Sequence, residues 1–221
     1  MKVVIIGAKN PETRRMIDSI IAVGNPGGME FYGFLDNDKS RQRENFVGLP
    51  VFGGFECLDQ LIAEGCMFIN TITGSTLARY ETSKTVSGRG GKFVNFIHPT
   101  VNVPAKMGVG NYIQEDVKIQ AAVEIGDNSS IHVSAIIAHQ CKVGSSTFIA
   151  HAVSVSGEVT IGDGVFVGTN ASILPAVKVG NWVTIGAGTV VLNDVPDYAV
   201  VVGNPGKVIR ENERRYPNGA I

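Results

Sequence analysis

The sequence predicts two parts: an α/β domain with a parallel sheet over residues 1–98, and a parallel β-helix over residues 99–221 that ends in a C-terminal cap. Two observations predict this organisation. In the first part, short β-branched apolar runs alternate with segments of helical spacing, which is typical of a parallel sheet. In the second part, an aliphatic residue recurs at every sixth position, sixteen times in succession without an insertion.

The six-residue period is neither helical nor a simple strand alternation. Four positions after each aliphatic residue stands a second small or branched residue, from Ala105 to Val195, and only Asn111 departs from this pattern. Both positions point inward only if the chain turns one corner in each hexad, so three hexads make one triangular coil. Coils stacked about 4.8 Å apart satisfy each other's backbone groups around an aliphatic interior. The aliphatic positions are Val101, Met107, Ile113, Ile119, Ile125, Ile131, Ile137, Val143, Ile149, Val155, Ile161, Val167, Ile173, Val179, Ile185 and Val191.

The elements of the first part follow from its hydrophobic periodicity. Strands are expected at residues 2–6, 31–35, 51–52, 67–72 and 93–97, and helices at residues 12–23, 55–63 and 76–87. The charged segment 39–45 is expected to be a solvated loop. Residues 98–100 (His-Pro-Thr) mark the junction, because a residue before proline avoids helical conformation.

Parallel sheets bind ligands beyond the carboxyl ends of their strands. Three loops are expected to meet there: Gly7–Asn10, Asp36–Asp38 and Thr73–Ser75. The candidate substrate-binding residues are Lys9, Asn10, Asp36, Asn37 and Gly74. A carboxylate after the second strand is placed to accept hydrogen bonds from a nucleotide; alternatively, Gly7 only makes a tight turn and the aspartates only cap a polar turn. The segment GAKNPE lacks the G-x-G-x-x-G glycines, which argues against redox use of NAD.

Composition excludes several classes of protein. The chain has 19 basic and 20 acidic residues, so nucleic acid is not an expected partner. Its three cysteines, Cys57, Cys66 and Cys141, are far apart, which argues against a disulfide framework and fits a reducing cytoplasm. Neither a signal peptide nor a membrane span is expected, because the apolar run after Met1-Lys2 is short. Cys141 falls on an inward position and is expected to be a small core residue.

The order of the two parts, with FIHPTV at the junction and VVGNPGK near the end, resembles the sugar-nucleotide acyltransferases of the NeuD/PglD type. The segments SAIIAH (residues 134–139) and IGAGTVV (residues 185–191) carry the same resemblance. It implies a Rossmann-like first domain that holds a nucleotide-sugar and a left-handed β-helix that forms a homotrimer. It also implies that acetyl-CoA, the co-substrate, lies in the groove between neighbouring subunits, in a cytoplasmic enzyme of surface-polysaccharide biosynthesis.

By this resemblance His139 is the catalytic base. An attacking amine or hydroxyl must lose a proton, and an imidazole titrates near neutrality. The family usually has a glutamate directly after this histidine, but here it is Gln140, which can orient the ring without supplying charge. The family often has a second histidine where Phe148 stands. His132 and His151 are expected to stack in adjacent coils, so one of them is a candidate for the missing contact.

The resemblance places acetyl-CoA against Phe148, Gly157, Thr169 and Ala187. No metal site is expected: zinc needs converging imidazoles, whereas His139 and His151 are twelve residues apart and belong to different sides of a prism. The favoured function is an acetyl-CoA-dependent N-acetyltransferase that acts on the amino group of a nucleotide-linked amino-deoxysugar by direct transfer. The alternatives are a sugar O-acetyltransferase and a non-catalytic β-helical scaffold.

Overall fold

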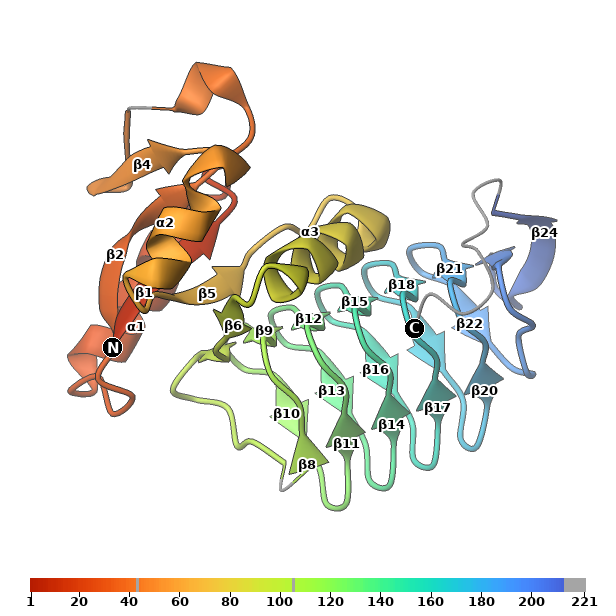
Figure 1. The fold of residues 1–221 in the computed structure, drawn as a ribbon. Coiled ribbons are helices and arrows are strands. Elements are labelled where there is room, and N and C mark those ends of the chain that lie inside the picture. Colours follow the sequence, from red (N-terminus) through yellow and green to blue (C-terminus); the bar gives the residue numbers. More distant parts are fainter. Residues whose placement is uncertain (43, 105, 213–221) are drawn as a thin grey trace.

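The computed structural model describes residues 1–42, 44–104 and 106–212. It consists of two parts that lie side by side: an α/β part and a three-sided prism of stacked coils (Figure 1). Ala105, an expected inward residue, and residues 213–221 of the expected cap lie outside the described residues. No helix in the described part of the chain is long and apolar enough to cross a membrane.

The α/β part contains the predicted parallel sheet. Its strands lie in the order β3-β4-β2-β1-β5-β6, and only β3 is antiparallel to its neighbour. Apolar side chains of β1 alternate between two cores: Val3 and Ile5 face α1, whereas Val4 and Ile6 face α2 and α3. The elements are β1 Lys2–Ile6, α1 Glu12–Ala22, β2 Glu30–Leu35, η1 Lys39–Arg41, β3 Asn45–Phe46, β4 Leu49–Gly53, η2 Phe55–Cys57, α2 Leu58–Ala63, β5 Met67–Asn70, α3 Thr76–Gly88 and β6 Lys92–Phe93.

Two details differ from the expected elements. The segment 39–45 is not only a loop, because it contains η1 and reaches β3. The single strand expected at residues 93–97 is two strands: β6 pairs with β5, whereas β7 (Phe96–Ile97) pairs with β9 of the prism. Asn95 lies between them, accepts a hydrogen bond from the Asn111 amide and donates one to Gly108. The chain therefore enters the prism before His98, through polar contacts that the hydrophobic pattern does not encode.

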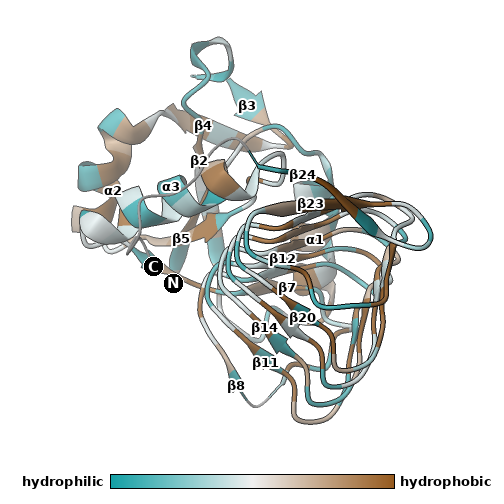
Figure 2. Cartoon of the chain, turned by 90° about the vertical axis from the view of Figure 1, so that its right-hand side faces the viewer, coloured by the Kyte–Doolittle hydropathy of each residue, from teal (hydrophilic) through white to brown (hydrophobic). Residues whose placement is uncertain are grey.

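The prism confirms the six-residue prediction. Its two-residue strands pair in parallel with the strand eighteen residues further on, for example Ile131 with Ile149, which makes three sheets. Figure 2 looks down the stack of coils. We call the sheets face 1 (β9, β12, β15, β18, β21), face 2 (β10, β13, β16, β19, β22) and face 3 (β8, β11, β14, β17, β20), in chain order. The strands are β8 Lys106–Met107, β9 Tyr112–Ile113, β10 Lys118–Ile119, β11 Glu124–Ile125, β12 Ser130–Ile131, β13 Ile136–Ile137, β14 Lys142–Val143, β15 Phe148–Ile149, β16 Ser154–Val155, β17 Thr160–Ile161, β18 Phe166–Val167, β19 Ser172–Ile173, β20 Lys178–Val179, β21 Thr184–Ile185, β22 Val190–Val191, β23 Ala199–Val202 and β24 Lys207–Glu211.

The corners use a left-handed residue in every hexad. From Gly110 to Gly188, every sixth residue has a positive φ, and most of these residues are not glycine. The glycines that follow the aliphatic residues serve another purpose. A Cβ at Gly144 would lie 2.6 Å from the Gly162 carbonyl oxygen, and one at Gly168 would lie 2.5 Å from the Ala187 nitrogen. These glycines therefore allow successive coils to stack closely.

Asn111, the one exception to the inward pattern, lies in a buried polar column. Its side-chain amide donates to the carbonyl oxygens of Gly108 and Gly126, and its oxygen accepts from the Ser129 amide. Ser129 and Thr147 continue the column in the next coils. These polar groups are tolerated inside because each has a partner.

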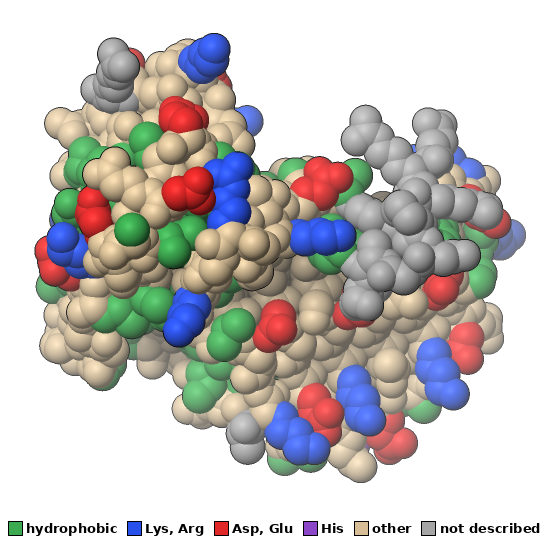
Figure 3. Space-filling view, in the orientation of Figure 1, with side chains coloured by type: hydrophobic (Ala, Val, Ile, Leu, Met, Phe, Trp, Pro, Cys, Tyr) green, Lys and Arg blue, Asp and Glu red, His purple; other side chains and the backbone are tan. Residues whose placement is uncertain are grey.

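The outer surfaces of the prism differ in chemistry. Face 3 carries charged side chains, among them Lys106 and Glu124, which form an ion pair of 2.7 Å. Figure 3 shows charged side chains along the lower edge of the prism. On face 2, by contrast, Ile136 and Leu192 keep more than a third of their surface exposed.

Candidate active site

A cavity of about 570 Å³ opens at the carboxyl ends of β1, β2 and β5. All five candidate substrate-binding residues line it, together with residues that the sequence pattern did not predict. The candidates are Lys9, Asn10, Asp36, Asn37 and Gly74, and the additional residues include Phe55, Thr71 and Thr82. The expected meeting of three loops is therefore present, because parallel strands direct their carboxyl ends to one side.

Most polar groups of this rim also have structural partners. The Asp36 carboxylate accepts hydrogen bonds from the amides of Ala8 and Asp38, at 2.9 Å each. Asn37 accepts from the Phe55 amide, and Asn10 accepts from the Glu12 amide at the start of α1. The capping role expected for an aspartate falls to Asp38, which accepts from Ser40 at the start of η1. A carboxylate oxygen has a second acceptor site, so these bonds leave Asp36 able to bind a hydroxyl group.

His139 lies on the outside of the prism, where the chain turns from face 2 to face 3. We call this corner edge 2–3. The side chain is exposed, and its Nδ1 lies 3.2 Å from the Gln140 Oε1. The amide oxygen can only accept, so this contact is a hydrogen bond in the tautomer that has its proton on Nδ1. Gln140 therefore contacts the ring, and its role in orienting the imidazole stays a prediction. It has a φ of 59°, and Glu158 stacks beneath it one coil further on.

Gly157 lies directly under the His139 ring in the next coil. A Cβ at this position would be 2.6 Å from Cε1 and 2.7 Å from Nε2 of the imidazole. The family resemblance predicts acetyl-CoA binding for Gly157, but it does not predict this contact with His139. The eighteen-residue spacing between the two positions was the signal that could have revealed it, and the same count finds Glu158 below Gln140.

The other candidate residues for acetyl-CoA are not next to His139 within one chain. Thr169 and Ala187 are stacked at the corner between faces 1 and 2, which we call edge 1–2, and both are exposed. His151 occupies the same column one coil earlier. His139 and His151 therefore lie at different edges, as their spacing predicts. Within the described residues, no group of three or more histidine, cysteine or acidic side chains is placed to hold a metal ion. Cys141 is a buried core residue, as predicted.

Phe148 and His132 belong to an aromatic column on face 1. The Phe148 ring stacks on Phe166 at 5.0 Å and lies 4.6 Å from the His132 ring. His132 is 4 % exposed, its Nε2 lies 3.0 Å from the Ser130 hydroxyl, and its Nδ1 has no hydrogen-bond partner. The predicted stacking with His151 is present, with ring centroids 4.9 Å apart. His132 is thus buried against aromatic neighbours, and His151 is the exposed member of the pair.

The burial of His132 predicts an acid-sensitive fold. Burial lowers the pKa of His132 to about 3, and the charges of His151 and Arg79 act in the same direction. In the unfolded chain this imidazole titrates near pH ~6.5, so between these values only the unfolded state binds the proton. The free energy of unfolding therefore falls as the pH drops, by up to about 1.4 kcal/mol per pH unit.

We expect His132→Phe to remove this part of the pH dependence. Denaturant unfolding of the wild type and of His132→Phe, at several pH values between about 7 and 4, measures this dependence. The readout is the slope of the unfolding free energy against pH, not the absolute stability. The prediction would be contradicted if the unfolding free energy fell equally steeply with decreasing pH in both proteins.

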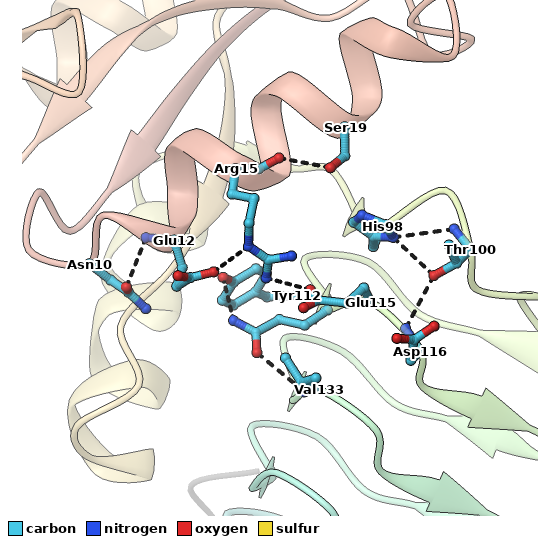
Figure 4. A network of polar contacts seen from close by, with 11 residues as sticks. Asn10, Glu12, Arg15, Ser19, His98, Thr100, Tyr112, Glu115, Asp116 and Val133 are labelled. Atoms are coloured by element: carbon cyan, nitrogen blue, oxygen red, sulfur yellow. Dashed lines mark hydrogen bonds and ion pairs between the residues drawn. The ribbon is translucent and has the colours of Figure 1, made fainter.

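A polar network connects the α/β part to edge 1–2 (Figure 4). Arg15 of α1 forms ion pairs with Glu12 and with Glu115, which lies at edge 1–2. Glu12 directly follows Asn10 and Pro11 of the cavity rim. Through α1, the α/β part that contains the cavity therefore contacts edge 1–2 of its own prism, whereas His139 lies at edge 2–3.

Comparison with known proteins identifies the class. Residues 158–193 match the family model described as bacterial transferase hexapeptide (six repeats). No curated protein matches the chain significantly. Among solved structures, a histidine variant of perosamine N-acetyltransferase from Caulobacter crescentus, in complex with CoA and GDP-perosamine, is 29% identical with a TM-score of 0.84, over 96% of this chain and 98% of that one. The acetyltransferase domain of PglB from Neisseria gonorrhoeae, in complex with acetyl coenzyme A, is 27% identical with a TM-score of 0.81, over 94% and 98%.

WeeI from Acinetobacter baumannii has the same fold at 19% identity, with a TM-score of 0.81 over 95% of this chain and all of that chain (100%). The chain is an enzyme of the hexapeptide-repeat acyltransferases, and its prism is a left-handed parallel β-helix. Within that class it has the architecture of the sugar acetyltransferases, in which a Rossmann-like domain precedes the prism.

Proposed function

We propose that this protein transfers the acetyl group of acetyl-CoA to the amino group of a nucleotide-linked amino sugar, with His139 as general base. The observation that carries the proposal is the pairing of two features in one chain. These are a cavity suited to a nucleotide at the strand ends and an exposed imidazole whose Nε2 is free to accept a proton. The perosamine enzyme and the PglB domain, which have CoA and acetyl-CoA in their complexes, support the choice of acyl donor.

The reaction needs no covalent enzyme intermediate. The amine nitrogen attacks the thioester carbonyl carbon, and Nε2 of His139 takes the proton that the nitrogen loses. The carbon–sulfur bond then breaks, and the sulfur leaves as the CoA thiolate, which is protonated by the imidazolium or by water. Gln140 holds the ring so that Nε2 stays exposed, because its oxygen accepts from Nδ1.

The proposed active site is shared between subunits of a homotrimer. Within one chain, His139 and Gly157 lie at edge 2–3, whereas Thr169, Ala187 and the cavity are associated with edge 1–2. A neighbouring prism can bring the two edges together, and the exposed Ile136 and Leu192 on face 2 offer apolar surface for such packing. In this arrangement His139 of one subunit serves the sugar held by another.

The shared site predicts complementation between two inactive variants. His139→Ala removes the base, and Gly74→Trp places an indole in the open rim of the cavity, where a Cβ meets no atom within 4 Å. We expect each variant alone to be inactive, and mixed oligomers made by co-expression to regain activity, because some interfaces then join an intact base to an intact cavity. Mixed oligomers that stay inactive would contradict a shared site.

The function itself is tested by following release of the CoA thiol with acetyl-CoA and GDP-perosamine, and with UDP- and dTDP-linked amino sugars. The matched control is the GDP-sugar that carries a hydroxyl in place of the amine. We expect thiol release and a gain of one acetyl group only with an amino sugar. Acetylation of the hydroxyl control would instead establish a sugar O-acetyltransferase, and neither reaction nor binding of any nucleotide-sugar would refute the proposal.

A further inference from the structure

Among the residues that the structure describes, Arg79 on α3 is the largest fully buried side chain, with 1 % of its surface exposed. Each of its five N–H groups donates to a backbone carbonyl oxygen. Nη1 donates to Asn70 at 2.8 Å and to Ile72 at 3.1 Å. Nη2 donates to Gly110 at 3.2 Å and to Ser129 at 3.3 Å, and Nε donates to Asn128. Burial lowers the pKa of this guanidinium to about 9, so it remains charged at neutral pH.

The five carbonyl groups belong to two different parts of the molecule. Asn70 ends β5, and Ile72 lies in the loop of residues 71–74, which lines the cavity. Gly110, Asn128 and Ser129 lie at the corner between faces 3 and 1, over which α3 extends (Figure 1). A single side chain therefore connects the rim of the cavity to the prism.

The connection also runs through the backbone of Arg79. Its carbonyl oxygen accepts from the side-chain amides of Asn70 at 3.1 Å and Asn128 at 3.4 Å. Asn70 in addition accepts from the Ile72 amide, which fixes the first turn of the rim loop. The next residue of α3, Tyr80, also contacts the prism. Its ring packs against Trp182, several coils away from Asn128, with ring centroids 5.5 Å apart.

A buried guanidinium is an unexpected choice if stability were all that mattered. Removing a charge from water is costly, and apolar residues of similar volume often replace buried ions without loss of stability. The planar fork of arginine does provide five directed bonds at once. Its distinctive contribution is thus the relative placement of the carbonyl groups that it bonds.

We propose that Arg79 is a positioning residue for acyl transfer, which holds the cavity rim at a set distance and orientation from the prism. This rests on the proposed function, in which the cavity presents the acceptor amine and the prisms present the thioester and His139. Because both partners of the reaction are attached through the prism, a shift of the rim displaces the amine from the acetyl carbon.

The test uses the full-length protein with GDP-perosamine and acetyl-CoA as probes. Arg79→Met keeps the apolar volume and removes all five donors, and Arg79→Lys keeps the charge with three donors. We expect kcat to fall about tenfold or more for Arg79→Met and less for Arg79→Lys, because misplacement by about 1 Å is enough for such losses. The KM for acetyl-CoA should stay within about twofold, because Arg79 does not touch the proposed acetyl-CoA residues.

Leu61→Ala is the matched control, because it loosens the core of the α/β part at α2 without contacting Arg79. It should lower thermal stability and leave kcat unchanged in the folded protein, which separates positioning from loss of stability. Wild-type kcat in folded Arg79→Met would overturn the inference, and if that variant does not fold, the same result in Arg79→Lys would do so.

A readout without activity keeps the inference separate from the proposed function. Hydrogen exchange of the rim amides at residues 71–75 should be faster in the Arg79 variants than in Leu61→Ala. If the rim amides of the Arg79 variants exchange no faster, the inference is overturned, even if the wild-type protein acetylates no sugar. If these amides do exchange faster but the wild-type protein is inactive, only the proposed function is refuted.

Discussion

Replacement of His139 by alanine is expected to lower kcat for acetyl transfer by about 10²–10⁴-fold, the usual contribution of a general base. The ring is exposed and makes one side-chain hydrogen bond, to Gln140, so its loss leaves the core of the prism untouched. We therefore expect an unchanged melting temperature and unchanged binding of acetyl-CoA, measured by calorimetry, together with the loss of turnover.

His98→Ala is the control for this experiment. His98 lies at the junction and bonds to Thr100, away from edge 2–3, so its removal should leave kcat nearly intact. If His139→Ala retains a kcat within about threefold of wild type, the role of His139 is refuted, because removal of a general base lowers kcat far more than that.

Replacement of Gly157 by alanine is expected to lower kcat by about 100-fold, because a small displacement of a catalytic group has effects of that size. The new methyl carbon would lie 2.6 Å from the His139 ring, which forces the exposed imidazole to swing away from Gln140. The backbone need not move, since the φ of Gly157 is not in the left-handed region. Steady-state kinetics with acetyl-CoA varied at saturating amino sugar measures the effect.

Two comparisons identify how Gly157 acts. If it acts through His139, the double variant His139→Ala/Gly157→Ala should be no slower than His139→Ala alone, because coupled residues are not additive. A raised KM for acetyl-CoA with unchanged kcat would instead assign Gly157 to acetyl-CoA binding. Gly88→Ala is the steric control, because a Cβ there meets no atom within 4 Å.

Much of the prism could be predicted because the regular six-residue period fixes which residues stack on one another. Each coil contains eighteen residues, so stacked neighbours such as Ile131 and Ile149 follow from their positions in the sequence. The contact between His132 and His151 follows in the same way, because their hexads begin at these two residues. The three loops of the cavity were predictable for a similar reason, because parallel strands leave their carboxyl ends at one side of the sheet. In both cases, the period of the apolar residues carries the information.

Other features had no such signal. His132 has the outward position of its hexad, yet Tyr112 and Phe148 bury it. The strand expected at residues 93–97 is divided between two sheets by the polar contacts of Asn95. Nothing in the spacing around Arg79 marked it as buried, because its partners come from carbonyl groups about 30 to 50 residues away as well as from nearby ones.

By itself, the sequence determined the repeating prism, the parallel sheet and the candidates on each, since burial of apolar residues imposes a local period that survives in any arrangement of the two parts. The tertiary structure alone decided which side chains meet between those parts, which histidine is buried and which edge of the prism accompanies the cavity. These contacts depend on how the α/β part is placed against the prism, and that placement is set by directed hydrogen bonds between distant residues, which have no period to be read.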